Sequence, residues 1–317
     1  MPSPDGLADW FAHRTFAADD LALSDLVARK RARGLSVSLV LPARNEHETI
    51  RGVVEAGVAL AGDLVDEVVV LDGASTDGTA ELAAAAGATV HQDSQILPQF
   101  GRALGKGDAL WRSLTVTSGD IVAFVDTDIR NPDPRFVWGI VAPLLLDDDI
   151  GFVKGFYDRP LEVGGVLQPS GGGRVTELTA RPLLNLFWPS LAGMVQPLSG
   201  EYAGRRHLLE RVPFFTGYGV EIGLLIDIAM RHGADAIAQV DVGRRIHRNQ
   251  DLVSLSRMSF AIAHVALQRL SEAGRARFSE ELETRYVQFG RDGGGRITVE
   301  PRQVVDVERP PICELDA

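Results

Sequence analysis

Residues 121–128 have the sequence IVAFVDTD, an apolar run that ends in two carboxylates separated by one residue. Runs rich in Val, Ile and Phe are typical of strands buried on both faces, so we expect a strand over residues 121–125. Asp126 and Asp128 then lie at the carboxyl end of this strand, where α/β proteins bind ligands. Because residues two apart in an extended chain share a face, both carboxylates can point into one crevice.

The spacing of these two carboxylates indicates a metal site. Like charges held this close repel each other unless a cation lies between them. Mg²⁺ is the simplest such cation, because it typically takes one or two carboxylates and leaves its other positions to water and substrate phosphates. A pair of surface turn residues is the alternative, since Asp-x-Asp also occurs at ordinary strand ends. The pattern alone leaves both interpretations open.

The rest of the chain alternates between strand and helix patterns around this stretch. We expect strands over residues 36–42, 67–71, 88–91 and 151–157. We expect helices over residues 48–61, 78–86, 107–118, 136–146, 175–186, 220–232 and 252–273, with another short helix near residues 21–27 and a flexible turn at 290–296. Strands alternating with helices predict an α/β fold with a mostly parallel sheet and right-handed crossovers.

The composition argues against several classes of protein. A net charge of −11 argues against nucleic-acid binding, which would require a basic face. No apolar window reaches the length of a membrane span, and the first residues show no secretory pattern. Cys313 is the only cysteine, so no disulfide can form within the chain and we expect a cytoplasmic protein. Arginines gather at 174–181, 205–206 and 244–248, which is typical of binding an anionic small molecule.

Polar residues also follow the first two predicted strands. PARNE occupies residues 42–46 and DGASTDGT residues 72–79, at the same predicted sheet edge as Asp126. Glycine there lets backbone approach a ligand closely. Asn45, Ser75 and Thr76 could instead cap the following helices. Neither GxGxxG after a strand nor GxxxxGK[ST] is present, so dinucleotide and P-loop chemistry have no support.

These motifs carry a resemblance to a known family. PARNE (42–46), LDGASTDGT (71–79), GKGDALWRSL (105–114) and FVDTD (124–128) resemble GT-A glycosyltransferases that use a nucleotide sugar. A second, more specific set resembles glucosyl-3-phosphoglycerate synthases and their mannosyl-3-phosphoglycerate synthase relatives, and consists of GGGRVTELTARPLL (171–184), QPLSGEYAGRR (196–206), GYGVEIGLLID (217–227) and AIAQVDVGRRIHRN (236–249). The match covers roughly residues 35 to 270.

The resemblance implies a fold and a division of the chain. The fold is α/β of GT-A type, with a mostly parallel nucleotide-binding sheet flanked by helices and a mixed α/β acceptor-binding half. We expect an N-terminal helical arm (1–34), a nucleotide-sugar-binding half (35–130), an acceptor-binding and catalytic half (131–273) and a C-terminal extension (274–317). We also expect a homodimer, because the apolar helices of the second half can support one.

The resemblance further implies an activity. The protein would transfer glucose from a nucleotide donor, UDP-glucose first among the candidates, to the 2-hydroxyl of 3-phosphoglycerate, with retention of anomeric configuration. A mannosyl transfer from GDP-mannose and a sugar-nucleotide-binding regulator without turnover are the alternatives. A polyprenyl-phosphate sugar transferase shares the first motifs, but we would expect it to carry a membrane anchor.

The site residues follow from the same resemblance. The metal, Mg²⁺ or Mn²⁺, would be held by Asp128 and His247, and these two with Glu221 form the catalytic set. The nucleotide sugar would contact Pro42, Ala43, Asn45, Glu46, Asp72, Lys106, Asp126, Tyr218 and Glu221. The acceptor would contact Gly173, Arg174, Val175, Thr176, Arg245 and Asn249.

Structural alternatives exist for several of these residues. His247 could be an ordinary loop residue, Lys106 a solvated lysine at a helix start, and residues 171–176 a flexible connector. Tyr218 and Glu221 flank a helix start, where a carboxylate is favourable for the helix dipole alone. Arg44 departs from the apolar residue expected in PALNE, which leaves the contacts beside the nucleotide open.

Glu221 has two possible roles in a retaining transfer. It is the one nucleophile candidate in the second half for a double displacement. We favour the alternative, attack on the same face, in which the leaving phosphate takes the acceptor's proton and Glu221 holds sugar hydroxyls.

Overall fold

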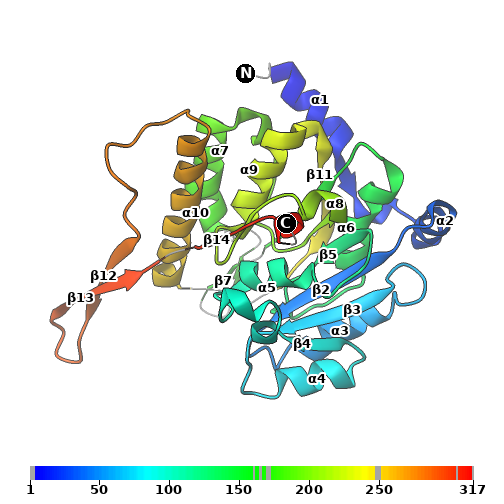
Figure 1. The fold of residues 1–317 in the computed structure, drawn as a ribbon, viewed down its shortest axis with the longest axis horizontal. Coiled ribbons are helices and arrows are strands. Elements are labelled where there is room, and N and C mark those ends of the chain that lie inside the picture. The colour runs from blue at the N-terminus through cyan, green and yellow to red at the C-terminus, as the bar shows by residue number, and fades with distance from the viewer. Residues whose placement is uncertain are drawn as a thin grey trace.

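The computed structural model describes residues 4–159, 161–163, 166–168, 173–246, 251–304 and 306–315. A central sheet runs in the order β1-β11-β6-β9-β5-β2-β3-β4 (Figure 1). Its strands are β1 (Thr15–Ala17), β2 (Val37–Ala43), β3 (Glu67–Asp72), β4 (Thr89–Gln92), β5 (Ile121–Phe124), β6 (Phe152–Asp158), β9 (Tyr202–Arg205) and β11 (Ile237–Arg244). Every neighbouring pair is parallel except the two pairs that contain β9. The predicted α/β fold with a mostly parallel sheet is confirmed.

The five predicted strands all form, each with ends within one residue of the expected positions. Three further sheet strands, β1, β9 and β11, were not predicted. The apolar pattern of β11 is interrupted by Gln239, which is fully buried. Its side chain is nevertheless satisfied, because it donates to Thr15 Oγ1 (3.0 Å) and accepts from Val195 N (2.8 Å). The strand was therefore not predicted, because a hydrophobicity pattern does not recognise a polar residue that is buried with its hydrogen bonds satisfied.

Helices cover both faces of the sheet. The α-helices are α1 (Pro4–Arg14), α2 (Leu23–Arg33), α3 (Ile50–Val58), α4 (Thr79–Ala85), α5 (Lys106–Ser113), α6 (Arg135–Leu146), α7 (Arg181–Phe187), α8 (Arg206–Leu209), α9 (Val220–His232) and α10 (Leu252–Glu272). A π-helix (Thr176–Ala180) precedes α7, and short 3₁₀ turns occupy Ala18–Asp20, Asp93–Gln95, Pro98–Phe100, Pro189–Leu191, Ala234–Ala236 and Ile312–Glu314.

Several predicted helices differ from those observed. The helix expected near residues 21–27 is α2, which extends to Arg33, and the helix expected over 48–61 is α3, which ends at Val58. The helix expected over 107–118 ends at Ser113, where the Ser113 hydroxyl donates to Leu110 O (2.6 Å) and the Thr115 hydroxyl donates to Arg112 O (2.8 Å). Such side-chain bonds to the backbone compete with the helix. The helix expected over 175–186 is interrupted because its first residues adopt the wider π-helix.

The core forms two apolar layers, one on each face of the sheet. In β5, Val122 and Phe124 belong to one layer, whereas Ile121 and Ala123 belong to the other. The first layer includes side chains of α5, α7, α9 and α10, and the second includes side chains of α2, α3, α4 and α6. This burial on both faces is why β5 is apolar at every position.

Smaller strands lie outside the central sheet. They pair as β7 (Leu161–Val163) with β8 (Val166–Gln168), β10 (Phe214–Phe215) with β14 (Glu308–Arg309), and β12 (Arg285–Arg291) with β13 (Ile297–Gln303). The turn expected at 290–296 connects β12 to β13, and this hairpin projects from the body in Figure 1. Within the described part of the chain, we find no helix long and apolar enough to span a bilayer.

The strand directions determine where a site can form. Strands β2, β3, β5, β6 and β11 run in the same direction, so their carboxyl ends meet at one edge of the sheet. The antiparallel β9 begins at this edge, directly after Gly200 and Glu201. Residues far apart in the sequence therefore converge there.

Candidate active site

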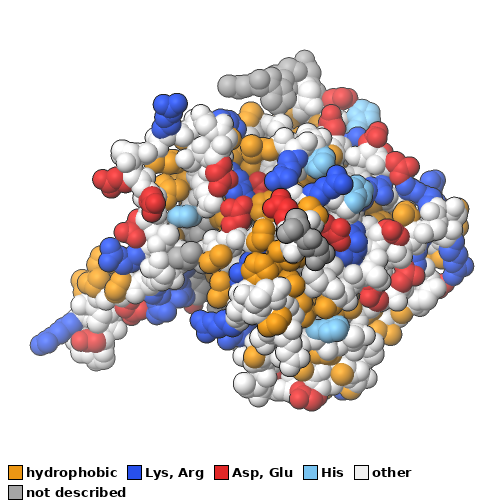
Figure 2. All heavy atoms as spheres, in the orientation of Figure 1, with side chains coloured by type: hydrophobic (Ala, Val, Ile, Leu, Met, Phe, Trp, Pro, Cys, Tyr) orange, Lys and Arg blue, Asp and Glu red, His pale blue; other side chains and the backbone are white. Residues whose placement is uncertain are grey.

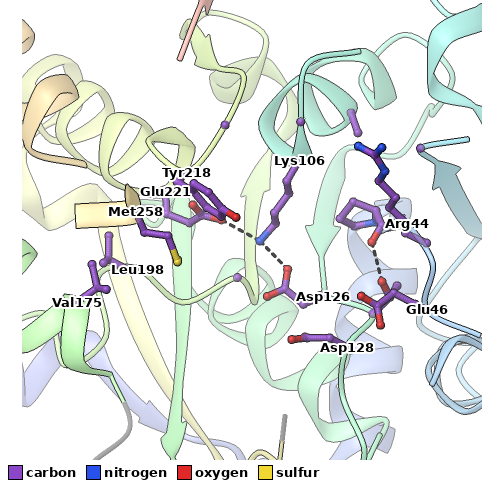
Figure 3. A pocket seen from close by; sticks show the side chains of 18 of the residues that line it. Arg44, Glu46, Lys106, Asp126, Asp128, Val175, Leu198, Tyr218, Glu221 and Met258 are labelled. Atoms are coloured by element: carbon purple, nitrogen blue, oxygen red, sulfur yellow. Dashed lines mark hydrogen bonds and ion pairs between the residues drawn. The ribbon is translucent and has the colours of Figure 1, made fainter. Parts of the chain in front are cut away.

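A cavity of about 490 Å³ opens at this edge of the sheet (Figure 3). It lies at the carboxyl ends of parallel strands, where open α/β sheets bind ligands. The predicted site residues that line it are Pro42, Ala43, Glu46, Lys106, Asp126, Asp128, Gly173, Arg174, Val175, Thr176, Tyr218, Glu221 and Arg245. The structure thus brings most of the predicted residues into one cavity.

Asp126 and Asp128 lie at the centre of the cavity, and both face cationic side chains. Lys106 Nζ lies 2.5 Å from Asp126 Oδ1, and Arg245 Nη2 lies 3.3 Å from Asp126 Oδ2 and also forms an ion pair with Asp128. Thr127, between the two aspartates, donates its hydroxyl to Pro42 O (2.7 Å) and so ties the end of β5 to the end of β2. The two aspartates are therefore not an unconstrained surface turn.

Asp126 is ionised at neutral pH. Burial acts to raise its pKa, but the charges of Lys106 and Arg245 hold that pKa well below its usual range. An ionised carboxylate is the form that binds a hard cation. The charge of Asp126 is thus set by the cations around it.

Lys106 is held over the cavity by the start of α5. Gly107 follows it, and a Cβ atom at Gly107 would meet Phe215 O at 1.9 Å, so glycine permits α5 to pack directly on the backbone of β10. Lys106 Nζ reaches both Asp126 and Glu221 Oε1 (2.8 Å), as the dashed lines in Figure 3 show. Burial acts to lower the pKa of Lys106, but the charges of Asp126 and Glu221 raise it well above its usual value. The alternative of a freely solvated lysine is wrong.

Glu221 lies in the first turn of α9, close to Tyr218. It is 8% exposed, whereas Tyr218 is 49% exposed, and both line the cavity. In Figure 3, Tyr218 lies next to Glu221 and above Met258, on the side of Lys106 opposite Arg44. The carboxylate is paired with Lys106, so its role is not limited to a favourable interaction with the helix dipole.

Arg245 is almost fully buried, at 2% exposure. Besides the two aspartates it faces Glu201, with Arg245 Nη1 lying 3.3 Å from Glu201 Oε1. It also donates to the hydroxyl of Tyr157 (2.6 Å). A buried arginine with three carboxylate partners is a fixed part of the site rather than a solvated loop residue.

Residues 173–176 form the other end of the cavity from Arg44. Gly173 has φ +78, in the left-handed region that favours glycine, and the chain enters the helical segment directly after it. Val175 and Thr176 are buried, and Arg174 lines the cavity beside them. The first N–H groups of a helix have no partner within the helix, and together with an arginine they favour an anion.

Two predicted nucleotide-binding residues, Asn45 and Asp72, are not among the lining residues. Asn45 Oδ1 accepts from Thr76 N (3.0 Å), and Asn45 N donates to Ser75 Oγ (2.9 Å), so Asn45 connects the loops that follow β2 and β3. Asp72 accepts from Ser75 N (3.1 Å) and Gln92 Nε2 (2.9 Å) through Oδ2. Its other oxygen, Oδ1, is buried and has no hydrogen-bond partner among the described residues. Contact of either residue with a nucleotide stays a prediction.

The remaining predicted residues, His247 and Asn249, lie outside the described residues. Among the residues that are described, no group of three or more His, Cys, Asp and Glu side chains could hold a metal ion. The two aspartates nevertheless fit Mg²⁺ or Mn²⁺, because these hard ions accept carboxylate oxygens and complete their shells with water and phosphate.

The sequence analysis missed several lining residues. Arg159 follows β6, so the same strand-end argument that found Asp126 could have found it. Leu198, Met258 and Ile262 carry no comparable signal, because an apolar residue that lines a cavity looks like any core residue in the sequence. Glu201 and Lys154 lie behind the cavity, and both are buried.

Known proteins resemble this chain closely. The glycosyl transferase family 2 model matches residues 38–171. A glucosyl-3-phosphoglycerate synthase from Mycolicibacterium smegmatis is 47% identical over 96% of this chain and 98% of the relative. The chain belongs to the glucosyl-3-phosphoglycerate synthase family. The predicted family resemblance is thereby confirmed.

Two solved structures, one of a related mannosyl enzyme and one of a family member, share the fold. Mannosyl-3-phosphoglycerate synthase from Rubrobacter xylanophilus superposes with a TM-score of 0.90, at 42% identity and 98% coverage of both chains. Glucosyl-3-phosphoglycerate synthase from Mycobacterium tuberculosis, in complex with Mn²⁺, UDP and glucosyl-3-phosphoglycerate, superposes with a TM-score of 0.80, at 45% identity, covering 92% of this chain and 95% of that one. The GT-A type α/β fold expected for this family is present here.

Lys154 gives a prediction about stability and pH. It is 1% exposed, donates to Ser199 O (2.5 Å) and lies 4.4 Å from the centre of the Tyr202 ring. Burial lowers its pKa to about 7, and the charge of Lys106 adds to this effect while Glu221 and Glu201 oppose it. Above this pKa the unfolded chain binds one more proton than the folded chain, so the free energy of unfolding rises with pH.

We therefore expect the wild type to gain stability relative to a Lys154→Met variant as the pH rises from about 7 towards 10. Urea unfolding of both proteins across this range measures the difference in the free energy of unfolding. Because methionine does not titrate, other ionisable groups cancel in the comparison. A difference that stays constant with pH would contradict the lowered pKa.

Proposed function

We propose that this protein transfers glucose from UDP-glucose to the 2-hydroxyl of 3-phosphoglycerate. The anomeric carbon–oxygen bond to the diphosphate breaks, a bond to the acceptor oxygen forms, and UDP leaves with the acceptor's proton. The observation that carries this proposal is the convergence of Asp126, Asp128, Lys106 and an arginine-bearing helix start in one cavity. Family members from M. tuberculosis were crystallised with UDP-glucose and phosphoglyceric acid.

The donor would bind across the ends of β2, β3 and β5, within the half formed by residues 35–130. Pro42, Ala43 and Glu46 would face the nucleoside, and the free oxygen of Asp72 would accept an N–H from it. A buried carboxylate oxygen without a partner costs free energy, so a donor supplied by the ligand stabilises the complex. Lys106 would lie beside the diphosphate.

Asp128 and His247 would hold Mg²⁺ or Mn²⁺, with Asp126 near the metal's waters or the ribose. When bound, such an ion neutralises the charge that develops on the leaving diphosphate. The chain itself keeps Asp126 ionised through Lys106 and Arg245.

The acceptor would bind in the half formed by residues 131–273. Its phosphate and carboxylate would meet the N–H groups of residues 173–176, the Arg174 guanidinium, Arg245 and Asn249. Two anionic groups on one small molecule suit this arrangement, because each can take a separate donor set.

Asp128→Asn tests the metal site. The variant should bind Mn²⁺ in the presence of UDP at least about 10-fold more weakly, because the amide lacks the carboxylate charge. Isothermal titration measures this binding without reference to turnover. Asp120→Asn, at the opposite end of β5, is the control and should bind Mn²⁺ like the wild type. Equal binding by Asp128→Asn would remove Asp128 from the metal site.

Glu221→Gln tests the role of the carboxylate beside Lys106. We expect kcat to fall about 100-fold while KM values for both substrates change little, since the amide can still bind but no longer carries charge. Steady-state kinetics measure this, with Glu210→Gln, directly after α8, as the control. A glucosyl adduct trapped on Glu221 and identified by mass spectrometry would contradict same-face attack.

Product analysis tests the function as a whole. The wild type is incubated with 3-phosphoglycerate, Mg²⁺ and UDP-glucose, GDP-glucose or GDP-mannose in separate reactions. Glucosyl-3-phosphoglycerate formed fastest from UDP-glucose supports the proposal. Mannosyl transfer is the second candidate because the R. xylanophilus mannosyl enzyme superposes with the higher TM-score of 0.90. Absence of product with every donor would favour a binding protein without turnover.

We also propose a cytoplasmic homodimer. The compartment is supported by the single, exposed Cys313. Dimerisation is supported by the β12–β13 hairpin, whose exposed apolar side chains are Val287 (44%), Phe289 (68%), Ile297 (66%) and Val299 (62%). These residues share one face, since Phe289 pairs with Val299 across the hairpin. Figure 2 shows apolar side chains gathered on this projecting arm.

The opposite face of the hairpin already has a partner within the chain. Tyr286 packs on Phe260 of α10 with 5.2 Å between ring centres, and Gln288 donates to Val253 O (3.0 Å). A second copy would bury the remaining apolar face.

The double variant Phe289→Glu/Val299→Glu should be monomeric under conditions where the wild type is dimeric, because four charges would face each other across the interface. Light scattering coupled to size-exclusion chromatography measures the mass. Arg302→Glu, an exposed change on the other face, should leave the mass unchanged. A double variant that remains dimeric would exclude this face.

A further inference from the structure

After the β12–β13 hairpin the C-terminal segment returns to the body of the molecule, where β14 pairs with β10 (Figure 1). We call residues 306–315 the C-terminal strap. Thr216 N donates to Val307 O (2.9 Å), and β14 within the strap pairs with β10. Cys313 N donates to Glu210 O (3.1 Å), which fixes the end of the strap beside α8. No described residue of the strap is among those that line the cavity.

Asp306 lies at the beginning of the strap, inside the turn that precedes α9. Its Oδ2 accepts from Gly219 N (2.5 Å), the residue that caps α9. A Cβ atom at Gly217 would lie only 2.0 Å from Asp306 Oδ1, so the turn 217–219 closes around the carboxylate in a way that only glycine permits. The first N–H groups of a helix have no partner within the helix, and Asp306 supplies one.

The carboxylate of Asp306 is half-buried and faces backbone N–H groups of this turn. No cation partner for it is recorded in the described part of the chain. Burial raises its pKa to about 6, with the charge of Glu221 adding to the rise, while N–H groups of Gly219 and Tyr218 oppose it. Partial burial of a carboxylate costs free energy, and the hydrogen bond from Gly219 N offsets part of this cost.

The turn around Asp306 carries two side chains of the site. Tyr218 is its central residue, and Glu221 follows in the first turn of α9. Glu221 in turn forms the ion pair with Lys106. The position of both Tyr218 and Glu221 thus depends on the path of the backbone around Asp306.

The strap also contacts α5, the helix that begins with Lys106. Arg309 forms two bonds to Asp108, Nε to Oδ1 at 3.0 Å and Nη2 to Oδ2 at 2.8 Å, and both side chains are buried. Asp108 lies two residues after Lys106 in α5, and Asp108 N donates to Thr216 O (3.2 Å). Trp111 of the same helix donates Nε1–H to Pro310 O (2.7 Å). One short segment therefore contacts the two elements that meet at Lys106 and Glu221.

We propose that Asp306 is a positioning residue for the transfer reaction, and that through it the C-terminal strap holds Tyr218 and Glu221 against Lys106. This inference rests on the proposed function. Misplacing a group at the reacting centre by about 1 Å can reduce the rate about 100-fold, so a contact behind the cavity can control turnover.

Three substitutions at Asp306 separate shape from charge. Asp306→Ala removes the acceptor for Gly219 N–H and should lower kcat about 10-fold or more. Asp306→Asn keeps an acceptor oxygen of the same reach and should retain kcat within about threefold. Asp306→Glu keeps the charge but is one methylene too long for the space beside Gly217, so its kcat should fall like that of the alanine variant.

Steady-state kinetics with UDP-glucose and 3-phosphoglycerate measure these effects, and KM for 3-phosphoglycerate should stay within about twofold because no described residue of the strap lines the cavity. Asp292→Ala is the matched control. Asp292 also accepts backbone N–H groups, from Gly294 (2.9 Å) and Arg296 (2.9 Å), but in the hairpin turn outside the site. It should have wild-type kinetics.

If Asp306→Ala does not fold, the comparison of the asparagine and glutamate variants decides. An active asparagine variant beside an impaired glutamate variant supports the proposal, and equal kcat values for the two overturn it. A folded alanine variant with wild-type kcat also overturns it. A wild type that forms no product from any donor contradicts the proposed function instead, so the two failures are distinguishable.

Discussion

The site depends on the compensation of charge at one edge of the sheet. Asp126, Asp128, Glu201 and Glu221 converge there, although like charges repel strongly where water is scarce. Lys106 lies between Asp126 and Glu221, and Arg245 pairs with Asp126, Asp128 and Glu201. Removing either cation would leave buried carboxylates without a partner, which is far more costly than losing a surface ion pair.

This arrangement requires close approach between elements that are distant in the sequence. Lys106 begins α5, Glu221 begins α9, and Arg245 follows β11. Gly107 allows α5 to lie on the backbone of β10, and the C-terminal strap ties β10 to both helices. The two apolar layers of the core make the sheet rigid beneath these contacts. The packing of these elements thus brings Lys106, Glu221 and Arg245 into one cavity.

A family name does not by itself explain how this chain builds its cavity. Lys106 and Arg245 form ion pairs with the two aspartates, so the protein's own cations hold both side chains in place and lower the pKa of Asp126. Such preorganisation means that a ligand or an ion does not have to order these side chains when it binds. The start of α9 is likewise ordered before any ligand binds, because Asp306, from a distant part of the chain, accepts the N–H of Gly219.

Much of the fold was predictable from local patterns. The strands over 36–42, 67–71, 88–91, 121–125 and 151–157 are dominated by apolar residues, and each formed within one residue of its expected ends. The strand β9 was not predicted because it is only four residues long and contains glycine, and β11 because the paired Gln239 interrupts its pattern. The helix expected to reach residue 118 stopped at Ser113 because hydroxyl groups bonded to the backbone there.

By itself, the sequence determined the α/β class, the strand end that carries Asp126 and Asp128, and the motifs that identify the family. These are local properties, because alternation of apolar residues and the residues at a strand end depend on neighbours in the chain. Only the tertiary structure decided that Arg245 lies on the aspartates, that Asn45 joins two loops instead of lining the cavity, and that Asp306 caps α9. Those contacts join residues separated by many positions, and no local pattern encodes which of many possible partners the fold will bring within a few ångströms.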